Sequence, residues 1–248
     1  MDTISLVIAS VLILIPIFIS YKEHLGLEKE IIISIVRAII QLIIVGYVLD
    51  VIFGLQKPIY IIVLVLIMVI NAAANTKKRG AGIENVVFIS FISIVVGTVV
   101  TMTVLVISGA IEFTPNEVIP VAGMVVSNSM VAIGLSYRNL NNAFKNRRVE
   151  VEVKLSLGAD TKEASKDILR ESIKLAIIPT IDSAKTLGIV SLPGMMTGLI
   201  LAGTSPLIAI KFQIMVTFMI LSASSVATMI ATYLSYKSFF NKRKQLKI

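Results

Sequence analysis

Long uncharged apolar blocks, separated by short polar segments, run through the whole chain. Most blocks are close to the roughly 20 residues that an α-helix needs to cross a bilayer. We therefore predict an all-α fold: a polytopic transmembrane helix bundle of about seven spans that forms one domain over residues 1–248. The seven predicted spans are Ile4–Tyr21, Ile31–Leu49, Pro58–Thr76, Val86–Ile111, Val118–Tyr137, Ile177–Gly203 and Phe212–Tyr236.

The composition supports an integral membrane protein. Apolar residues make up 56% of the chain and charged residues 15%, whereas a soluble domain carries about 25% charged residues. We therefore do not expect a secreted, nucleic-acid-binding or disordered chain. The chain has no Cys and one histidine, His24, which excludes disulfides, thiolate metal sites and a His-rich zinc site. We expect the first block to be a retained span; a cleavable signal peptide is the alternative, but Asp2 replaces its basic start.

The distribution of Lys and Arg predicts the topology. With the N-terminus outside, the inside segments hold 19 of the 23 Lys and Arg residues, and the outside loops hold only Lys57 and Lys211. Basic residues accumulate in cytoplasmic loops. We therefore predict an outside N-terminus and an inside C-terminus in the cytoplasmic membrane, with lipid around the bundle. The net charge of +8 then belongs to the inside loops, and we expect no nucleic-acid partner.

The polar stretch over about 138–176 predicts a helix, a break and a second helix. Val149–Leu157 can form a short helix that Gly158 closes in a left-handed conformation. Asp160 precedes Glu163 at the spacing of a capping box, and Pro179 is expected to end or kink the second helix. Such an element could dock a cytoplasmic partner and transmit force to the spans. A plain solvated loop is the alternative interpretation.

Several motifs resemble one family of membrane proteins. The run Lys154-Leu-Ser-Leu-Gly-Ala-Asp160 is similar to the Gly-centred coupling motif of ABC-transporter permeases. Five further stretches, in the same order as in that family, resemble the FetB-type iron-export permeases of bacteria. They are Arg37-Ala-Ile-Ile-Gln-Leu-Ile-Ile-Val-Gly-Tyr47, Ile119-Pro-Val-Ala-Gly-Met124, Ile178-Pro-Thr-Ile-Asp-Ser-Ala-Lys-Thr186, Val190-Ser-Leu-Pro-Gly-Met-Met-Thr-Gly198 and Gln213-Ile-Met-Val-Thr-Phe218.

The resemblance implies a permease that exports iron with a separate ABC ATPase, in an assembly of two permease copies and two ATPase subunits. Plant members of the wider family are associated with aluminium tolerance, so the exact metal stays open. The coupling role would fall on Leu155, Leu157, Gly158 and Ala159, with Glu152 as a possible match to the acidic residue of the motif.

The chain contains no G-x-x-x-x-G-K-[ST] phosphate-binding loop. We therefore expect a transport subunit that is not itself an enzyme and binds no cofactor of its own. If the transporter is driven by ATP, then ATP and Mg²⁺ bind to the partner ATPase. This absence agrees with a polar docking segment that receives work from another chain.

Polar residues inside the predicted spans form a second candidate site. Ionisable groups at membrane depth usually face the bundle interior or a cavity. We predict an inner polar layer in which Arg37 pairs with Asp182, or Asp182 with Lys185, and which acts as a vestibule or a latch. Snorkelling of the two cationic side chains to the headgroups is the alternative. The layer comprises Arg37, Gln41, Asn71, Asn75, Asp182 and Lys185.

The pair Pro193-Gly194 interrupts the sixth predicted span, and Gly198 and Gly203 continue a face of small residues. Proline removes a backbone hydrogen bond, and a broken helix at membrane depth survives only where it lines protein or water. The break therefore indicates either a hinge that lines the pathway or a kinked helix that serves packing alone.

Two further features could bind an ion. Most of the Met residues, among them Met102, Met124, Met130, Met195, Met196, Met215 and Met219, fall in the last four spans. Thioethers favour soft ions, but Met is also a flexible packing residue. Glu112 and Glu117 could receive an exported cation, or they could be ordinary caps of an outer loop. The metal ligands are not predicted.

Three classes of function agree with these features to different degrees. The leading hypothesis is an ABC-transporter permease. An ion-coupled secondary transporter usually shows inverted repeats and deep carboxylates, and we find no internal repeat. A membrane scaffold that docks a cytoplasmic partner would use the polar segment but not the broken sixth span.

Overall fold

A computed structural model describes residues 3–55 and 57–247, and these residues form helices joined by turns, with two isolated β-bridges and no β-strand. The all-α fold is thus confirmed. The chain divides into two compact units, Met1–Gln56 and Lys57–Ile248. The single domain over residues 1–248 stays a prediction.

The first unit is a helical hairpin. Ser20 organises its turn, because its hydroxyl donates to Glu28 Oε1 at 2.7 Å and accepts from the Leu27 backbone N–H at 3.0 Å. The helices are α1 (Thr3–Ala9), the 3₁₀ turn η1 (Ser10–Ile13), α2 (Leu14–Lys22) and α3 (Glu28–Leu55). Of these, α3 is long and apolar enough to cross a membrane over Glu28–Gly54, whereas Val7–Lys22 is shorter.

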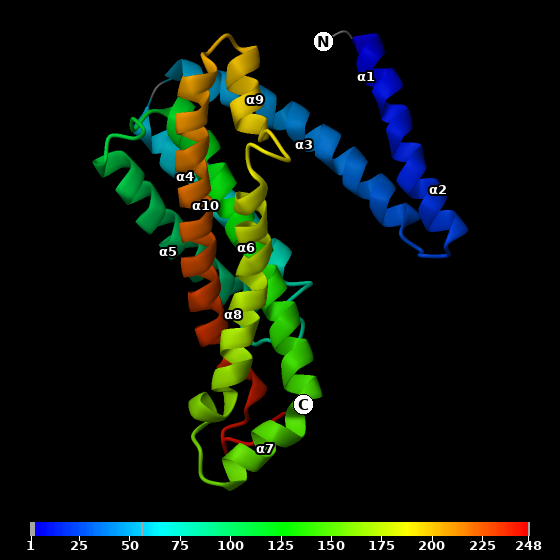
Figure 1. Cartoon of the computed structure of the whole chain (residues 1–248), viewed down its shortest axis with the longest axis vertical. Coiled ribbons are helices and arrows are strands. Elements are labelled where there is room, and N and C mark those ends of the chain that lie inside the picture. The colour runs from blue at the N-terminus through cyan, green and yellow to red at the C-terminus, as the bar shows by residue number, and fades with distance from the viewer. Residues whose placement is uncertain (1–2, 56, 248) are drawn as a thin grey trace. The chain divides into compact units, whose positions relative to one another are not determined.

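The second unit is a bundle around one central helix, α6, which packs against α4, α5, α8 and α10 (Figure 1). Proline occupies the start of three long helices, where its fixed φ suits the first turn and its missing N–H costs nothing. The helices are α4 (Pro58–Thr76), α5 (Val86–Ile107), α6 (Pro115–Asn146), α7 (Arg148–Ser156), α8 (Thr161–Thr186), α9 (Gly194–Leu201), α10 (Pro206–Ser235) and the 3₁₀ turn η2 (Tyr236–Phe239).

Small residues let two of these helices approach closely. A Cβ added at Gly97 of α5 would lie 3.1 Å from the Ala223 carbonyl oxygen and 3.2 Å from the Ala227 Cβ of α10. These distances leave little room for a larger residue, which agrees with the close helix packing that the sequence predicts for this block.

Five helices of the described residues are long and apolar enough to span a membrane, and five of the seven predicted blocks correspond to them. The sixth predicted span is not one helix. Instead, α8 begins at Thr161, passes through Pro179 without ending, and stops at Thr186; a turn over 187–193 then leads to the short α9. Of the two outcomes expected at Pro179, an end or a kink, the helix end does not occur, because α8 continues on both sides of this residue.

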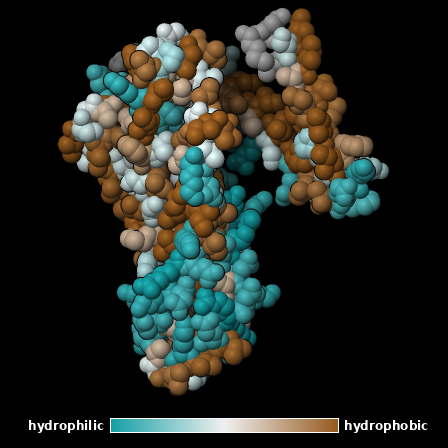
Figure 2. Space-filling model, viewed as in Figure 1, coloured by the Kyte–Doolittle hydropathy of each residue, from teal (hydrophilic) through white to brown (hydrophobic). Residues whose placement is uncertain are grey.

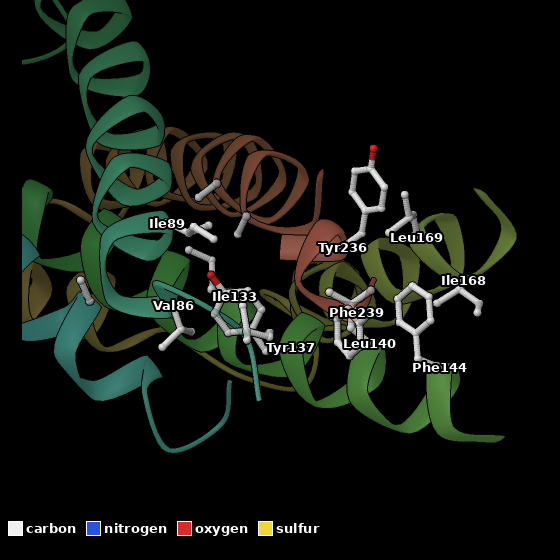
Figure 3. Packing of buried hydrophobic residues seen from close by; sticks show 14 of the residues in the cluster. Val86, Ile89, Ile133, Tyr137, Leu140, Phe144, Ile168, Leu169, Tyr236 and Phe239 are labelled. Carbon is white, nitrogen blue, oxygen red and sulfur yellow. The ribbon is translucent and has the colours of Figure 1, made fainter. Parts of the chain in front are cut away.

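A packed aromatic cluster closes one end of the second unit. The rings of Phe144 and Phe239 stack with their centroids 4.2 Å apart, and Phe240 meets Phe144 edge-on at 5.9 Å. Figure 3 shows Phe144 and Phe239 beside Ile168 of α8 and Leu140 of α6. The cluster therefore ties the end of α6 to the start of α8 and to the C-terminal segment.

Candidate functional site

The helix, break and helix predicted from the sequence are present as α7, the turn 157–160 and α8. Gly158 adopts φ +93°, a conformation that L-residues with a Cβ avoid. Its N–H donates to the Leu155 carbonyl and the Ala159 N–H donates to the Lys154 carbonyl, both at 3.0 Å. This pair of bonds is the Schellman arrangement that closes a helix. We call α7, this turn, the first half of α8 and the C-terminal segment 237–247 the end module.

The expected capping box at Asp160 is not formed. Asp160 has the extended backbone of an N-cap residue, but its side chain makes no capping hydrogen bond. Lys244 Nζ donates to Asp160 Oδ1 at 2.8 Å; this bond, the nearby backbone N–H of Thr161 and the lysine charge lower the pKa of Asp160 below its ordinary value. Glu163 pairs with Lys166. The Asp160 carboxylate thus also bonds a lysine that is distant in the sequence.

Ion pairs join α7 to α8. Glu150 accepts from Arg147 at 2.7 Å and from Lys154 at 2.8 Å, and these two cations lower its pKa to about 2. The same cations reach across to α8, Arg147 to Glu171 at 3.0 Å and Lys154 to Asp167 at 2.9 Å. Exposed pairs are each worth little, but Arg147 and Lys154 each link α7 to α8.

One face of α7 presents apolar side chains to the surroundings. Val149, Val153 and Leu157 recur at four-residue spacing and are 72%, 52% and 83% exposed, so they form a single stripe. We call these three residues the α7 stripe. The opposite face holds Val151, which is buried. Figure 2 shows an apolar patch at this end of the second unit, beyond a mainly hydrophilic belt.

The five residues predicted to couple the chain to an ATPase gather around the end of α7. Leu157 is exposed, whereas Leu155 and Ala159 pack partly against the core. A Cβ at Gly158 would meet no heavy atom within 4 Å, and Glu152 is paired with Arg148 at 2.8 Å. Their role in coupling stays a prediction.

The C-terminal segment packs as part of the end module, a role that the sequence pattern does not predict. Besides the pair with Asp160, Lys247 Nζ donates to Glu84 Oε1 at 2.7 Å, and this bond lowers the pKa of Glu84. A groove of about 820 Å³ lies between the end of α7 and this segment and is lined by Glu152, Gly158 and Arg243, among others. The basic composition of the segment predicts neither ion pair, because the two partners lie 84 and 163 residues away in the sequence.

The predicted polar layer divides into separate pairs. In the second unit Lys185 Nζ donates to Asp182 Oδ1 at 2.8 Å, and Asn75 Nδ2 donates to Asn71 Oδ1 at 2.8 Å. The Asp182–Lys185 pair is one of the two alternatives predicted, and it is exposed. Arg37 and Gln41 lie one turn apart on α3 of the first unit and are exposed within the chain.

Asp182 also lies further along its helix than expected. Because α8 begins at Thr161 rather than near Ile177, Asp182 is about 32 Å from the helix start at 1.5 Å per residue. Where Asp182 lies relative to the membrane stays a prediction. Because the residues between Arg138 and Lys174 are largely polar, the hydropathy pattern does not show that α8 runs continuously from Thr161 to Thr186.

The break in the sixth predicted span borders a cavity that opens to the surface of the second unit. Pro193 precedes α9, and it lines a cavity of about 300 Å³ between α6, α8 and α10 together with Asn128, Ser183 and Gln213. A Cβ at Gly194 or Gly198 would meet no heavy atom within 4 Å. Pro193 thus lies beside the cavity, and the pathway role of the three residues stays a prediction.

The arrangement of Glu112, Glu117 and the Met residues does not support the other two ion-binding hypotheses. Glu117 Oε2 accepts the Glu112 backbone N–H at 2.7 Å, which is the local capping role. No group of three or more His, Asp or Glu residues that could hold a metal occurs in residues 3–55 and 57–247. Met219 is buried in the bundle, as a packing residue would be.

These features define the class: a multi-pass, all-helical membrane protein. The chain belongs to the family described as Uncharacterised protein family (UPF0014), whose model matches residues 3–240. It is 52% identical to the Probable iron export permease protein FetB of Escherichia coli over 98% of this chain and 94% of that protein.

Plant relatives match almost as fully. The chain is 38% identical to Protein ALUMINUM SENSITIVE 3 of Arabidopsis thaliana, over 96% of this chain and 88% of that one. It is 39% identical to UPF0014 membrane protein STAR2 of rice, over 97% and 84%. No solved structure matches the chain.

Proposed function

We propose that this chain is the permease subunit of an ABC transporter that exports iron or a related metal, driven by a separate ATPase chain. The name of the E. coli relative, probable iron export permease, supports the cargo and the direction. The α7 stripe carries the rest of the proposal, because it is an apolar surface at the tip of a rigid polar module. In the assembly we envisage two permease copies and two ATPase subunits, with ATP and Mg²⁺ on the ATPase.

The positions of basic residues support an inside end module. Lys247 contacts Glu84, and Asn141 Nδ2 donates to the Ala81 carbonyl at 3.0 Å, so the α4–α5 loop lies at the same end as α7 and the C-terminal segment. These three segments hold most of the basic residues of the chain. Three Lys and Arg residues lie in the α4–α5 loop, nine between Arg138 and Lys174, and five after Tyr236. Because basic residues favour the cytoplasmic side, we assign the end module to the cytoplasm. Seven spans with an outside N-terminus remain part of the proposal.

The α7 stripe suits a docking site for the ATPase. Three apolar side chains one turn apart on a short helix could bind in an apolar groove on the ATPase. The helix is held in place by the Arg147–Glu171 and Lys154–Asp167 pairs, so a push on the stripe would pass into α8. From α8 the displacement would reach the cavity beside Pro193.

Co-purification tests this docking. The tagged chain is co-expressed with an ABC ATPase encoded beside it, and the ATPase retained in detergent is measured. Leu157→Asp should lower the retained ATPase about tenfold or more, the effect of removing a central interface residue. Ser156→Asp adds the same charge one residue away and should retain the ATPase. Equal retention by both variants would refute docking through the stripe.

A further inference from the structure

An exposed strip on α6 lies between the two helices that pack on either side of it. Ser127 and Val131 are exposed, although α6 is the central helix of the second unit. On one side of the strip is Gly123, where an added Cβ would contact a methionine of α4. On the other side is Asn128, which lines the surface cavity together with Ser183 of α8. At 3.6 residues per turn, the strip is thus bounded by α4 and α8 and covered by neither.

The flanking helices add exposed polar side chains to this strip. On α4, Thr76 faces α5 through a hydroxyl–hydroxyl bond of 2.7 Å. Asn71 and Asn75 lie on the other flank of α4 and are exposed. On α8, Lys185 pairs with Asp182 at 2.8 Å, and the two side chains are 69% and 57% exposed. We call the strip and these residues the open face, whose polar members are Asn71, Asn75, Ser127, Asp182, Ser183 and Lys185.

The polar residues of the open face lie at one level of the bundle. Met68 and Arg79 of α4 lie against two α6 glycines, each of which is 55 residues further along the chain. The two helices therefore run in the same direction, and Asn71 and Asn75 lie beside residues 126–130 of α6. The cavity that α8 shares with α6 lies at the same level. All three helices thus expose polar groups beside the strip.

This level falls inside a membrane that α6 crosses. The helix is long and apolar enough to span one, and Ser127 lies about 18 Å from its first residue at 1.5 Å per residue. A hydrocarbon core about 30 Å thick would therefore enclose the open face. An ion pair and amides are costly against lipid tails, and such groups normally face protein or water. The open face therefore needs a cover.

The chemistry of the open face is complementary to itself. In a two-fold contact the same surface of both copies meets, so each residue faces groups of its own kind of surface. Asp182 and Lys185 carry opposite charges three residues apart, so a two-fold axis beside α8 can bring the carboxylate of one copy to the ammonium of the other. Amides and hydroxyls both donate and accept, and small polar residues of this kind join helices within membranes.

We propose that the open face is the contact surface between two copies of this chain in the membrane. The inference rests on the proposed function, in which two permease copies assemble, and it assigns their contact to α4, α6 and α8. The exposed residues of α5 then face lipid, and they are mainly apolar, as Val99, Val100 and Val104 show. Because α8 begins in the end module and reaches the open face, work received at the end module passes directly to the contact between the copies.

Single-cysteine variants test this contact, because the chain has no Cys and a disulfide can then form only between copies. The full chain is oxidised with copper phenanthroline in membranes, with and without a co-expressed ATPase, and the covalent dimer is measured on non-reducing gels. Ser127→Cys and Ser183→Cys, alone or co-expressed, replace small exposed hydroxyls of the open face. At least one of these combinations should give covalent dimer as the main product, since residues near a two-fold axis come within disulfide range.

Val100→Cys is the matched control. The hydroxyls of Ser90 on α5 and Tyr137 on α6 are 3.0 Å apart. Because these two helices are antiparallel neighbours, Val100 lies at the level of Ser127, each ten residues from that bond. Val100 is 44% exposed, but α5 contributes no residue to the open face. This variant should stay mainly monomeric after oxidation.

Charge reversal tests the same surface by a second route. Asp182→Lys leaves only cations at the two charged positions, and Lys185→Asp leaves only carboxylates. When the two chains carry different tags, Asp182→Lys should retain Lys185→Asp about tenfold better than it retains a second copy of itself. This is the effect of exchanging a like-charge contact for an opposite-charge contact.

Three results would overturn the contact: no covalent dimer from the open face with or without the ATPase, as much dimer from Val100→Cys, or equal retention of like and opposite charge variants. The first result would leave a water-filled pathway as the occupant of this face. Covalent dimer through the open face, but no ATP-driven transport, would count against the proposed function alone. ATP-driven transport without such a dimer would count against the contact surface alone.

Discussion

Gly158→Val isolates the contribution of one backbone conformation to the end module. Gly158 has φ +93°, and an added Cβ would meet no heavy atom within 4 Å. The variant therefore introduces conformational strain without a clash. A left-handed conformation costs a residue with a Cβ about 1–2 kcal/mol, and a β-branched side chain falls at the upper end.

The chain can absorb this strain by opening the turn. Opening breaks the hydrogen bonds from the Gly158 and Ala159 N–H groups, worth about 0.5–1.5 kcal/mol each. The perturbation is thus about 1–3 kcal/mol and stays local, because the Phe144 cluster is untouched. Since 1.4 kcal/mol is a factor of ten, amide hydrogen exchange over residues 155–161 should accelerate about tenfold or more.

Hydrogen exchange followed by mass spectrometry on the full chain measures this effect. Gly82→Val is the control: Gly82 has φ +89° with no heavy atom within 4 Å of an added Cβ, but it lies in the α4–α5 loop. Both variants should insert normally, and only Gly158→Val should reduce transport coupled to ATP hydrolysis. Unchanged exchange at the turn in Gly158→Val, or equal uncoupling by Gly82→Val, would refute the reasoning.

Three further predictions concern the end module. Phe144→Ala removes a fully buried ring stacked on Phe239 and should cost about 3–5 kcal/mol, measured by thermal unfolding in detergent; a loss below about 1 kcal/mol would contradict the packing. Lys244→Ala removes an exposed pair with Asp160, so the melting temperature should stay constant while limited proteolysis of the C-terminal segment accelerates; equal proteolysis would show that this pair does not hold it. The pKa of Glu150 is lowered from 4.5 to about 2, so its stabilisation is present above pH 4.5 and is lost as the pH falls through 2; unfolding midpoints across this range should fall less for Glu150→Gln than for the wild type, and parallel curves would contradict the network.

The hydrophobic pattern predicts most of the bundle. The third predicted block coincides with α4, because Pro58 fixes its start and the run of apolar residues ends at a basic loop. The sixth block misleads, since Ile189, Val190 and Leu192 in the turn between α8 and α9 are apolar although the backbone there is not helical. A hydropathy pattern registers side chains alone, and the turn is set by Gly188 at φ +82°.

The candidate sites were predictable only where their signal is local. Gly158 follows a short helix pattern and marks the turn directly. The pairs Lys244–Asp160 and Lys247–Glu84 join segments far apart in the chain, and no local pattern encodes them. Gln213 lies in one of the family-like motifs, but the cavity that it lines is formed by three helices far apart in the sequence.

Metal transport in reconstituted vesicles tests the central claim most directly. Purified permease and its ABC ATPase are incorporated together, and radiolabelled iron movement is measured with ATP, without ATP, and with the permease alone. If the ATPase drives the permease through the end module, iron movement should depend on ATP and on both chains. Leu157→Asp should then abolish iron movement. Iron movement by the permease alone, at the same rate with or without ATP, would contradict the account.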